Sequence, residues 1–321
     1  MLQEVIMKKF IIRPYQNKDI KSILSIYNQS RGTPMSLEQF KALDLNAKHF
    51  GYFRRYVLEE NNSILAYGHL MKRPGSREGY LITTIQVDQS HRNKGYGKAI
   101  WDRLWSLIQR EKPNGLETFI LDTEPISKEW AERIGFKMQA HEVESILRLK
   151  DYRPRYSLSK VPIMLDGLQY GNLANEESLD KWERACRLYL QLCQENPQFI
   201  RIDHLAIDVA KYILSPNRGV SEDSIWIAKD QEKWIGMTVL RRVHKKEMRN
   251  AFTAVCTEYQ GKGIGSILKY IASDFAYERK IAYLRTFNLS ANEAMLAINQ
   301  RMGYKKQSGQ WLMEWNLAEL Y

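Results

Sequence analysis

The sequence TAVCTEYQGKGIGSIL, residues 253–268, places three glycines at alternate positions between an apolar run that ends at Val255 and an amphipathic stretch that begins near Ile264. A similar sequence, IQVDQSHRNKGYGKAI, occupies residues 85–100, which lie 168 positions earlier. The same offset relates other identical residues around the two turns, and the pairs are Val87/Val255, Lys94/Lys262, Gly95/Gly263, Gly97/Gly265, Thr118/Thr286, Phe119/Phe287, Arg133/Arg301 and Gly135/Gly303. Because an unchanging offset is typical of a duplicated domain, we expect two tandem copies of one fold, each with a glycine turn at its centre.

The composition is that of a folded globular protein. The 321 residues, 44% hydrophobic and 26% charged, are enough for two domains with their own cores. No apolar run approaches the length that spans a bilayer, and the first residues lack the pattern of a signal peptide. The three cysteines, Cys186, Cys193 and Cys256, have neither disulfide nor metal-ligand spacing. We therefore expect a cytoplasmic protein without a membrane segment or a metal.

The charge balance is basic. A net charge of +11 and a pI near 9.4 favour anionic partners, such as a phosphorylated cofactor, an acidic substrate or nucleic acid. The basic clusters are short and are expected to be solvated surface, and they are Lys8-Lys9, Arg54-Arg55, Arg241-Arg242 and Lys245-Lys246. No zinc-finger spacing, basic zipper or RNA-binding aromatic signature accompanies them, so nucleic acid is not the partner that we expect.

The two copies are separated by a linker at about residues 150–161, where Pro154 and Pro162 interrupt regular structure. We therefore assign residues 1–152 to an N-terminal domain and residues 163–321 to a C-terminal domain. Each copy mixes helices and strands around one strand–glycine turn–helix unit, which predicts the α+β class. Four tryptophans are expected to pack between sheet and helices, and these are Trp226, Trp234, Trp311 and Trp315.

Apolar periodicity predicts the elements of each copy. In the first copy these are a helix over 19–27, a hairpin of 56–60 with 64–70, a strand over 81–87, a helix over 97–111, a strand over 116–122, a short helix over 127–134 and a strand over 141–149. In the second copy they are a helix over 179–193, a hairpin of 224–228 with 234–240, a strand over 251–255, a helix to about 279, a strand over 282–288, a helix over 292–302 and a strand over 311–315.

The glycine turn itself suggests a phosphate site. Glycines let the backbone approach a ligand closely, and the free amide groups at a helix start attract an anion such as pyrophosphate. Gly-x-x-x-x-Gly-Lys-Ser/Thr is absent, which argues against an ATP-hydrolysing P-loop. Gly261-x-Gly263-x-Gly265 also differs from the dinucleotide-binding pattern. The alternative is a tight strand-to-helix turn that binds nothing.

Two motifs resemble the GNAT superfamily, the Gcn5-related N-acetyltransferases. The family's Arg/Gln-x-x-Gly-x-Gly/Ala after a strand ending in Val is similar to Arg92…Gly95…Gly97 and to Gln260…Gly263…Gly265. Its second motif, roughly Asn-x-x-Ala-x-x-x-Tyr-x-x-x-Gly-Phe, resembles a segment of the second copy in which the corresponding residues are Asn292, Met295, Asn299, Gly303 and Tyr304. The opening Ile12-Arg13-Pro14 and the tandem arrangement, with Thr286-Phe287-Asn288, are also typical of the family.

The resemblance implies two copies of a mixed, mostly antiparallel sheet flanked by helices, and acetyl-CoA or another acyl-CoA as co-substrate. Its pyrophosphate would lie on the glycine turn, and its pantetheine arm in a slot where strands four and five splay apart. The cofactor-binding residues are then expected to be Ala254, Val255, Gln260, Gly261, Lys262, Gly263, Ile264, Gly265, Ser266, Asn288 and Asn292. A second candidate set lies in the first copy and consists of Val87, Arg92, Asn93, Lys94, Gly95, Tyr96, Gly97 and Lys98.

The chain departs from the family at the general acid. The usual tyrosine corresponds to Asn299 in the second copy and to Ala131 in the first, where Glu124 also replaces the usual Asn. We therefore expect the second copy to be catalytic and the first to be degenerate. The catalytic candidates are Asn292, Asn299 and Tyr304, and no base is assigned. Tyr304 as a core aromatic residue, Cys256 as a small core residue and Glu258 as a solvent-facing or helix-start group are the structural alternatives.

Two functions follow from these residues. One is N-acyl transfer to a primary amine of a small molecule or protein by direct attack on the thioester. The other is a non-catalytic acyl-CoA sensor or scaffold. Acceptor contacts are expected from residues 31–53 and 196–220, near acidic groups that either attract a cationic amine or pair with surface bases, namely Asp203, Asp208, Glu222 and Asp223. We expect a monomer with pseudo-twofold symmetry or a homodimer.

Overall fold

The computed structural model describes residues 10–30, 34–49, 51–72, 77–158, 161–196 and 207–318. The chain divides into two compact units. The first is built from the chain up to Phe119, from Ala131–Lys137 and from Met313 onward, and the second from Ile120–Trp130 and Met138–Leu312. The units therefore do not follow the repeat boundaries, because segments near the end of each copy join the other unit.

The first unit carries a mixed sheet. Four strands follow one another in antiparallel pairs, namely β1 (Phe10–Pro14), β2 (Phe53–Glu60), β3 (Ser63–Met71) and β4 (Tyr80–Val87). β5 (Gly115–Leu121) then runs parallel to β4. The helices are α1 (Ile20–Asn28), α2 (Leu37–His49), α3 (Tyr96–Glu111) and α4 (Pro125–Arg133). The side chains of α1 and α2 form a core with Val57 and Tyr67, and the predicted hairpin is confirmed.

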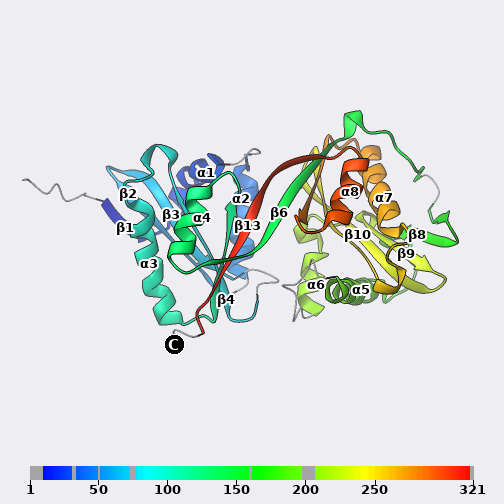
Figure 1. Cartoon of the computed structure of the whole chain (residues 1–321), viewed down its shortest axis with the longest axis horizontal. Coiled ribbons are helices and arrows are strands. Elements are labelled where there is room, and N and C mark those ends of the chain that lie inside the picture. Colours follow the sequence, from blue (N-terminus) through cyan, green and yellow to red (C-terminus); the bar gives the residue numbers. More distant parts are fainter. Residues whose placement is uncertain are drawn as a thin grey trace, which may run out of the picture. The chain divides into compact units, whose positions relative to one another are not determined.

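The second unit repeats this arrangement. Its antiparallel strands are β7 (Ile163–Leu165), β8 (Leu168–Asn172), β9 (Ile225–Asp230), β10 (Lys233–His244) and β11 (Glu247–Val255), and β12 (Tyr283–Leu289) is parallel to β11. Figure 1 shows one helix pair on each face: α5 (Lys181–Glu195) with α6 (Ile207–Ile213), and α7 (Ile264–Glu278) with α8 (Glu293–Arg301). The two faces bury separate apolar clusters. The predicted α+β class, with a mixed, mostly antiparallel arrangement of strands flanked by helices in each copy, is confirmed.

Each unit is completed by a strand from the other copy of the repeat. β6 (Lys137–Arg148) pairs antiparallel with β12 along the whole of that strand, from Tyr283 to Leu289. The end of β13 (Lys305–Asn316) lies in the first unit, where the Leu317 amide donates to the Asn114 carbonyl at 2.8 Å. There the Trp315 ring stacks on Trp105, with ring centroids 5.1 Å apart. Trp315 therefore packs between sheet and helix, as expected, but against the helix of the first copy.

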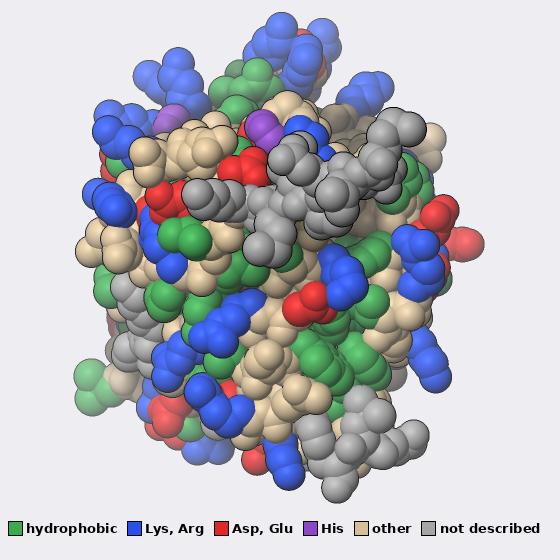
Figure 2. Space-filling view, turned by 90° about the vertical axis from the view of Figure 1, so that its left-hand side faces the viewer, with side chains coloured by type: hydrophobic (Ala, Val, Ile, Leu, Met, Phe, Trp, Pro, Cys, Tyr) green, Lys and Arg blue, Asp and Glu red, His purple; other side chains and the backbone are tan. Residues whose placement is uncertain are grey.

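Charged side chains are interspersed on the surface. On the face that Figure 2 presents, Lys and Arg alternate with acidic, polar and apolar groups instead of forming one basic tract. Within the residues that the structure describes, no helix combines the length and the apolar character needed to cross a membrane.

We predict that Trp315→Ala weakens the first unit selectively. The half-buried ring stacks on α3, so its loss should lower the free energy of unfolding by about 2–3 kcal/mol, below the range for a fully buried Trp. Hydrogen exchange followed by mass spectrometry should show faster exchange in residues 96–111. Trp311→Ala is the control, because that ring lies on the same strand but meets His141 in the second unit. Unchanged hydrogen exchange in α3 of Trp315→Ala would contradict the packing of β13 in the first unit.

Candidate functional site

In the second unit β11 and β12 pair at one end only, and the region beyond, where the two strands are no longer paired with each other, is named the slot. The two parallel strands pair only over three rungs, in which Glu247–Arg249 face Tyr283–Arg285. From Asn250 onward no strand of the described residues pairs with β11 on that side, whereas β12 remains paired with β6. In the first unit β4 and β5 also pair over only three rungs. The expected divergence of strands four and five is therefore confirmed in both units.

The backbone groups that face the slot follow from the ladder on the other edge of β11. The Cys256 amide donates to the Ile235 carbonyl at 2.8 Å, so Cys256 faces β10. Because backbone groups alternate along a strand, Ala254 also faces β10, and Val255 and Thr253 face the slot. Of the predicted contacts Ala254 and Val255, only Val255 turns its backbone to the open edge.

A buried polar cluster shapes β11 where the slot begins. The register between β10 and β11 shifts at Val239/Leu240, opposite Asn250. The Thr238 and Thr253 hydroxyls lie 2.7 Å apart, and the Asn250 amide donates to the Thr238 hydroxyl at 2.7 Å. These three buried side chains satisfy one another and hold the bulge.

The glycine turn follows directly on β11. Gly261 and Gly263 have φ of +75° and +83°, which favours glycine, and no heavy atom lies within 4 Å of the place of a Cβ at either residue. The backbone amides of Ser266 and Ile267 both donate hydrogen bonds to the Gly263 carbonyl. Helix geometry leaves the amides of Gly263, Ile264 and Gly265 without an intrahelical acceptor. The backbone amides at the start of α7 therefore lie beside open space at Gly261 and Gly263.

The side chains of the turn have different tasks. The Gln260 amide donates to the Val255 carbonyl at 3.0 Å and to Asn196 at 3.2 Å, so it ties the turn to β11 and to the end of α5. Lys262 is exposed, with its ammonium 4.9 Å from the centre of the Tyr259 ring. Ile264 is buried, and Glu258 is exposed and pairs with Lys233. Lys262 is therefore the cation nearest to the free amides on this turn.

The first copy has the same turn with one glycine fewer. Gly95 has φ of +85°, and Asn93 adopts φ of +62° in the place of Gly261. Gly97 lies 3.5 Å from Val87, as Gly265 lies 3.8 Å from Val255, measured from the place of a Cβ. Other predicted residues of this turn are used in the fold, because Tyr96 donates to Glu60, Lys98 pairs with Asp102 and Arg92 donates to Ser30.

A buried polar chain lines the second unit on the α7 face, and sequence reasoning missed its first member. The Lys269 ammonium donates to the side-chain oxygen Oδ1 of Asn299 at 2.7 Å, and the side-chain Nδ2 of Asn299 donates to Oδ1 of Asn288 at 2.8 Å. Lys269 and Asn299 are 1% and 2% exposed. No described residue accepts from the Asn288 Nδ2. The donors thus all point from α7 through α8 towards Asn288.

Burial lowers the pKa of Lys269 to about 7. No described carboxylate forms an ion pair with it, and the other close group is the Tyr304 ring, 5.2 Å from Nζ. Tyr304 is itself buried, which raises the pKa of its phenol, and its hydroxyl lies 3.5 Å from Ser273. Tyr304 therefore packs behind the chain, at the end remote from Asn288.

Asn292 has a structural task in the fold. Its side-chain oxygen accepts from the Met295 amide at 3.1 Å and so caps the start of α8.

Cys256 is buried, burial raises the pKa of its thiol to about 11, and the Gln191 amide is its neighbour. A thiol that resists ionisation is a poor nucleophile, which fits the expected role as a small core residue.

The acidic groups near the expected acceptor region have partners of their own. Glu222 accepts from Lys181 and from the Trp182 indole, and Asp223 accepts from Arg279. Asp208 lies 3.7 Å from Lys211. Asp203 falls outside the described residues. The described acids therefore act as partners of surface bases.

The polar chain has no equivalent in the first copy. The residues at the same offset are apolar, with Trp101 for Lys269, Ile120 for Asn288, Ala131 for Asn299 and Phe136 for Tyr304. Trp101 packs against Phe136 and Trp315, with centroids 6.3 and 6.2 Å apart. Aromatic rings therefore fill the place that the chain occupies in the second unit.

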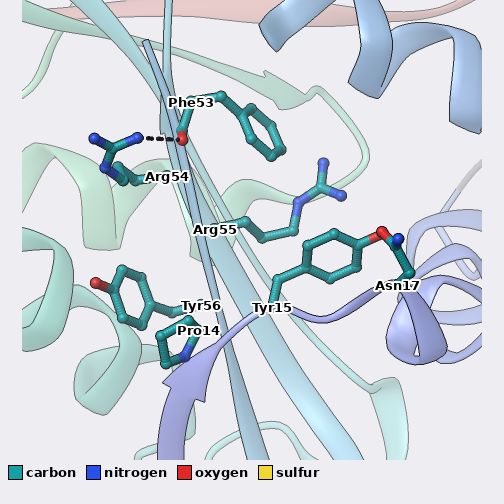
Figure 3. Close-up of a pocket in the computed structure, with 7 residues that line it drawn as sticks. All are labelled: Pro14, Tyr15, Asn17, Phe53, Arg54, Arg55 and Tyr56. Carbon is teal, nitrogen blue, oxygen red and sulfur yellow. Dashed lines mark hydrogen bonds between the residues drawn. The ribbon is translucent and has the colours of Figure 1, made fainter.

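A separate pocket of about 280 Å³ lies in the first unit, between β1 and β2. Figure 3 shows Arg55 pointing between Phe53 and Tyr15, with Arg54 directed away and donating to the Phe53 carbonyl. The Arg55 guanidinium binds Asp44 through two hydrogen bonds of 2.7 Å. Because Asp44 neutralises this cation, the Arg55 guanidinium is not a free charge for a ligand.

We predict that the buried lysine makes stability depend on pH. The pKa of Lys269 lies below its ordinary value of 10.5, so between about pH 7 and 10.5 the unfolded state binds more protons. Stability of the wild type should then rise with pH, by about 1 kcal/mol per unit, relative to Lys269→Met. Urea denaturation from pH 6.5 to 9.5 measures this difference. Lys21→Met, at an exposed lysine, is the control. If the stability difference from the wild type is independent of pH for both variants, the lowered pKa of Lys269 is contradicted.

Comparisons with known proteins support the fold assignment. The model of the acetyltransferase (GNAT) family matches residues 19–136 and again residues 181–304. No curated protein matches the chain. A GCN5-related N-acetyltransferase from Sphaerobacter thermophilus superimposes with a TM-score of 0.72 at 14% identity, covering 95% of each chain.

Two further solved structures share the fold. A tandem GNAT protein from the clavulanic acid biosynthesis pathway gives a TM-score of 0.71 at 15% identity, covering 95% of this chain and 98% of that chain. A glucosamine N-acetyltransferase region of a fungal multi-domain β-N-acetylglucosaminidase gives 0.72 at 15% identity, covering 97% and 38%. Because the family model matches both copies, the chain belongs to the acetyltransferase (GNAT) family and carries its fold twice.

Proposed function

We propose that the second unit transfers an acetyl group from acetyl-CoA to a primary amine of a small molecule or protein, and that the first unit is a degenerate copy. The observation that carries this proposal is the polar chain Lys269–Asn299–Asn288, because the first copy has Trp101, Ala131 and Ile120 in its place. A buried lysine without a carboxylate partner is costly to the fold, which argues that it serves the site.

The residues of the second unit fit an acyl-CoA. The free amides of Gly263, Ile264 and Gly265 and the positive end of α7 suit a pyrophosphate, with Lys262 at the rim. The open edge of β11 at Val255 and Thr253 offers backbone groups to an extended arm, as a strand edge does to an added strand. When bound, acetyl-CoA supplies an acetyl group activated as a thioester.

The polar chain supplies directed donors to the slot. Asn299 accepts from Lys269 and donates to Asn288, so the Nδ2 group of Asn288 keeps its hydrogens for a further acceptor. Donors fixed in this way stabilise negative charge that develops beside Asn288 during acyl transfer. Lys269 touches Asn299 and not the slot, so it is a positioning residue that orients and polarises the Asn299 amide.

One observation favours the non-catalytic alternative, an acyl-CoA sensor or scaffold. Neither copy has a tyrosine at the position of the family's general acid, since these positions hold Asn299 and Ala131. An asparagine donates a hydrogen bond but does not give up a proton in the working range. The alternative predicts acetyl-CoA binding without amine-dependent release of thiol.

We predict that the two glycine turns differ in acetyl-CoA binding. Gly263→Glu places a carboxylate against the free amides and should abolish the calorimetric signal, because like charge repels the pyrophosphate. Gly95→Glu makes the same change in the first copy, also at positive φ, and is the matched control. It should leave one equivalent bound. Loss of one equivalent in each variant would mean that both turns bind the cofactor.

We also predict a kinetic defect in Lys269→Met. Loss of the ammonium should lower kcat by about 10- to 100-fold through Asn299, with KM for acetyl-CoA little changed. Asn299→Leu should match it, and the double variant should be no worse than either single one, since both break the same chain. Thiol release with 5,5′-dithiobis(2-nitrobenzoate) measures the rates. A wild-type kcat in Lys269→Met would contradict the role of the chain.

A further inference from the structure

Three arginines lie side by side across the second sheet. Arg241 of β10 is the register partner of Arg249 of β11, and Arg249 is the partner of Arg285 of β12. Their neighbours Leu240, Met248 and Leu284 belong to the cluster under α7. Because side chains alternate along strands, the three arginines project from the opposite face, on the side of α5 and α6.

Three carboxylates lie near this row, because Glu144 and Glu247 pair with Arg285 and, together with Glu142, also attract the charge of Arg249. Arg285 forms ion pairs of 3.1 Å with Glu144 and with Glu247. Arg249 stacks on Phe287, with 4.6 Å from its guanidinium carbon to the ring centre, and forms no ion pair with a described residue. Arg241 likewise has none. The Nε atoms of Arg241 and Arg249 are both buried without a hydrogen-bond partner in the described structure.

Arg218 adds a further cation, on the side of the sheet that α5 and α6 cover. Arg218 follows α6, and its guanidinium stacks on the Tyr212 ring. The next residue, Gly219, is joined to β10, because the Arg242 amide donates to the Gly219 carbonyl at 2.7 Å. Burial first, then Arg249 and Arg218, lower the pKa of Arg241 to about 9. Like charges on neighbouring strands destabilise a sheet unless an anion lies between them.

The row crosses the closed end of the slot. Arg249 and Arg285 form the last paired rung before β11 and β12 diverge. The free edge of β11 leads from the glycine turn to this rung, over a distance of about 20 Å from Val255 to Arg249. If the turn holds the phosphates of acyl-CoA, the arginines lie at the other end, where an acceptor must approach.

We propose that Arg249, Arg241 and Arg218 bind an anionic group, a carboxylate or a phosphate, on a small-molecule amine that accepts the acetyl group. This inference rests on the proposed acetyl transfer by the second unit. The planar guanidinium matches both oxyanions through paired hydrogen bonds, which a lysine cannot do. The site is specific to the second unit, because the corresponding rung of the first unit pairs Ile82 with Glu117 in place of Arg249 and Arg285.

The test compares amines that differ only in the anionic group. Calorimetry in excess acetyl-CoA would measure phosphoethanolamine against ethanolamine, and β-alanine against its amide. We expect the anionic member of at least one pair to bind 10-fold or more tightly in the wild type, and Arg249→Met to remove that difference. The pair that shows the preference separates phosphate from carboxylate. Arg242→Met is the matched control, because Arg242 is exposed on the neighbouring strand β10 and pairs with Met248, on the opposite face of the sheet from Arg249.

Titration with acetyl-CoA alone separates the possible failures. If Arg249→Met binds acetyl-CoA as the wild type does, the variant is folded and its loss of anion preference supports the inference. If Arg249→Met does not fold, Arg249→Lys, which keeps the charge without the paired donors, should show a weakened preference. Equal binding of both members of each pair by the wild type would overturn the anion site while leaving the proposed acetyl transfer standing. Absence of acetyl-CoA binding in the wild type would remove both.

Discussion

The early divergence of β11 from β12 is the constraint on which the second unit depends. Pairing stops after Arg249, beside the bulge that Asn250, Thr238 and Thr253 hold. β12 cannot follow β11, because its other edge is fully paired with β6. A strand edge with unused backbone groups is normally a liability, and here it leads from a glycine turn with free amides to a row of arginines.

The two copies share one backbone arrangement but differ in the side chains packed beneath it, which are polar in one copy and aromatic in the other. Both have the short β-ladder, the turn with positive φ and the close contact of glycine with valine. They differ where α7 and α8 face β12. In the second unit three polar side chains form a directed chain there, and in the first unit Trp101, Phe136 and Trp315 stack together. Aromatic packing stabilises a core but offers no donor to a ligand.

Sequence patterns were sufficient for much of this architecture, because the constant offset and the glycines are local signals. Other features depend on contacts that no local pattern encodes. β7 and β8 were missed because they are short. The exchange of β6 and β13 was missed because a repeat does not specify which sheet its last strand joins. Lys269 stands among apolar helix positions, and only the fold brings it to the predicted site residue Asn299. Likewise, the arginine row depends on the strand register.

The most direct test of the account is the release of free thiol from acetyl-CoA by the wild-type protein, with and without a panel of primary amines. Catalysis in the slot of the second unit predicts slow release alone and a marked acceleration by at least one amine, with one acetylated amine formed per thiol. Stoichiometric binding of acetyl-CoA without acceleration by any amine would contradict catalysis and would identify the protein as an acyl-CoA-binding scaffold.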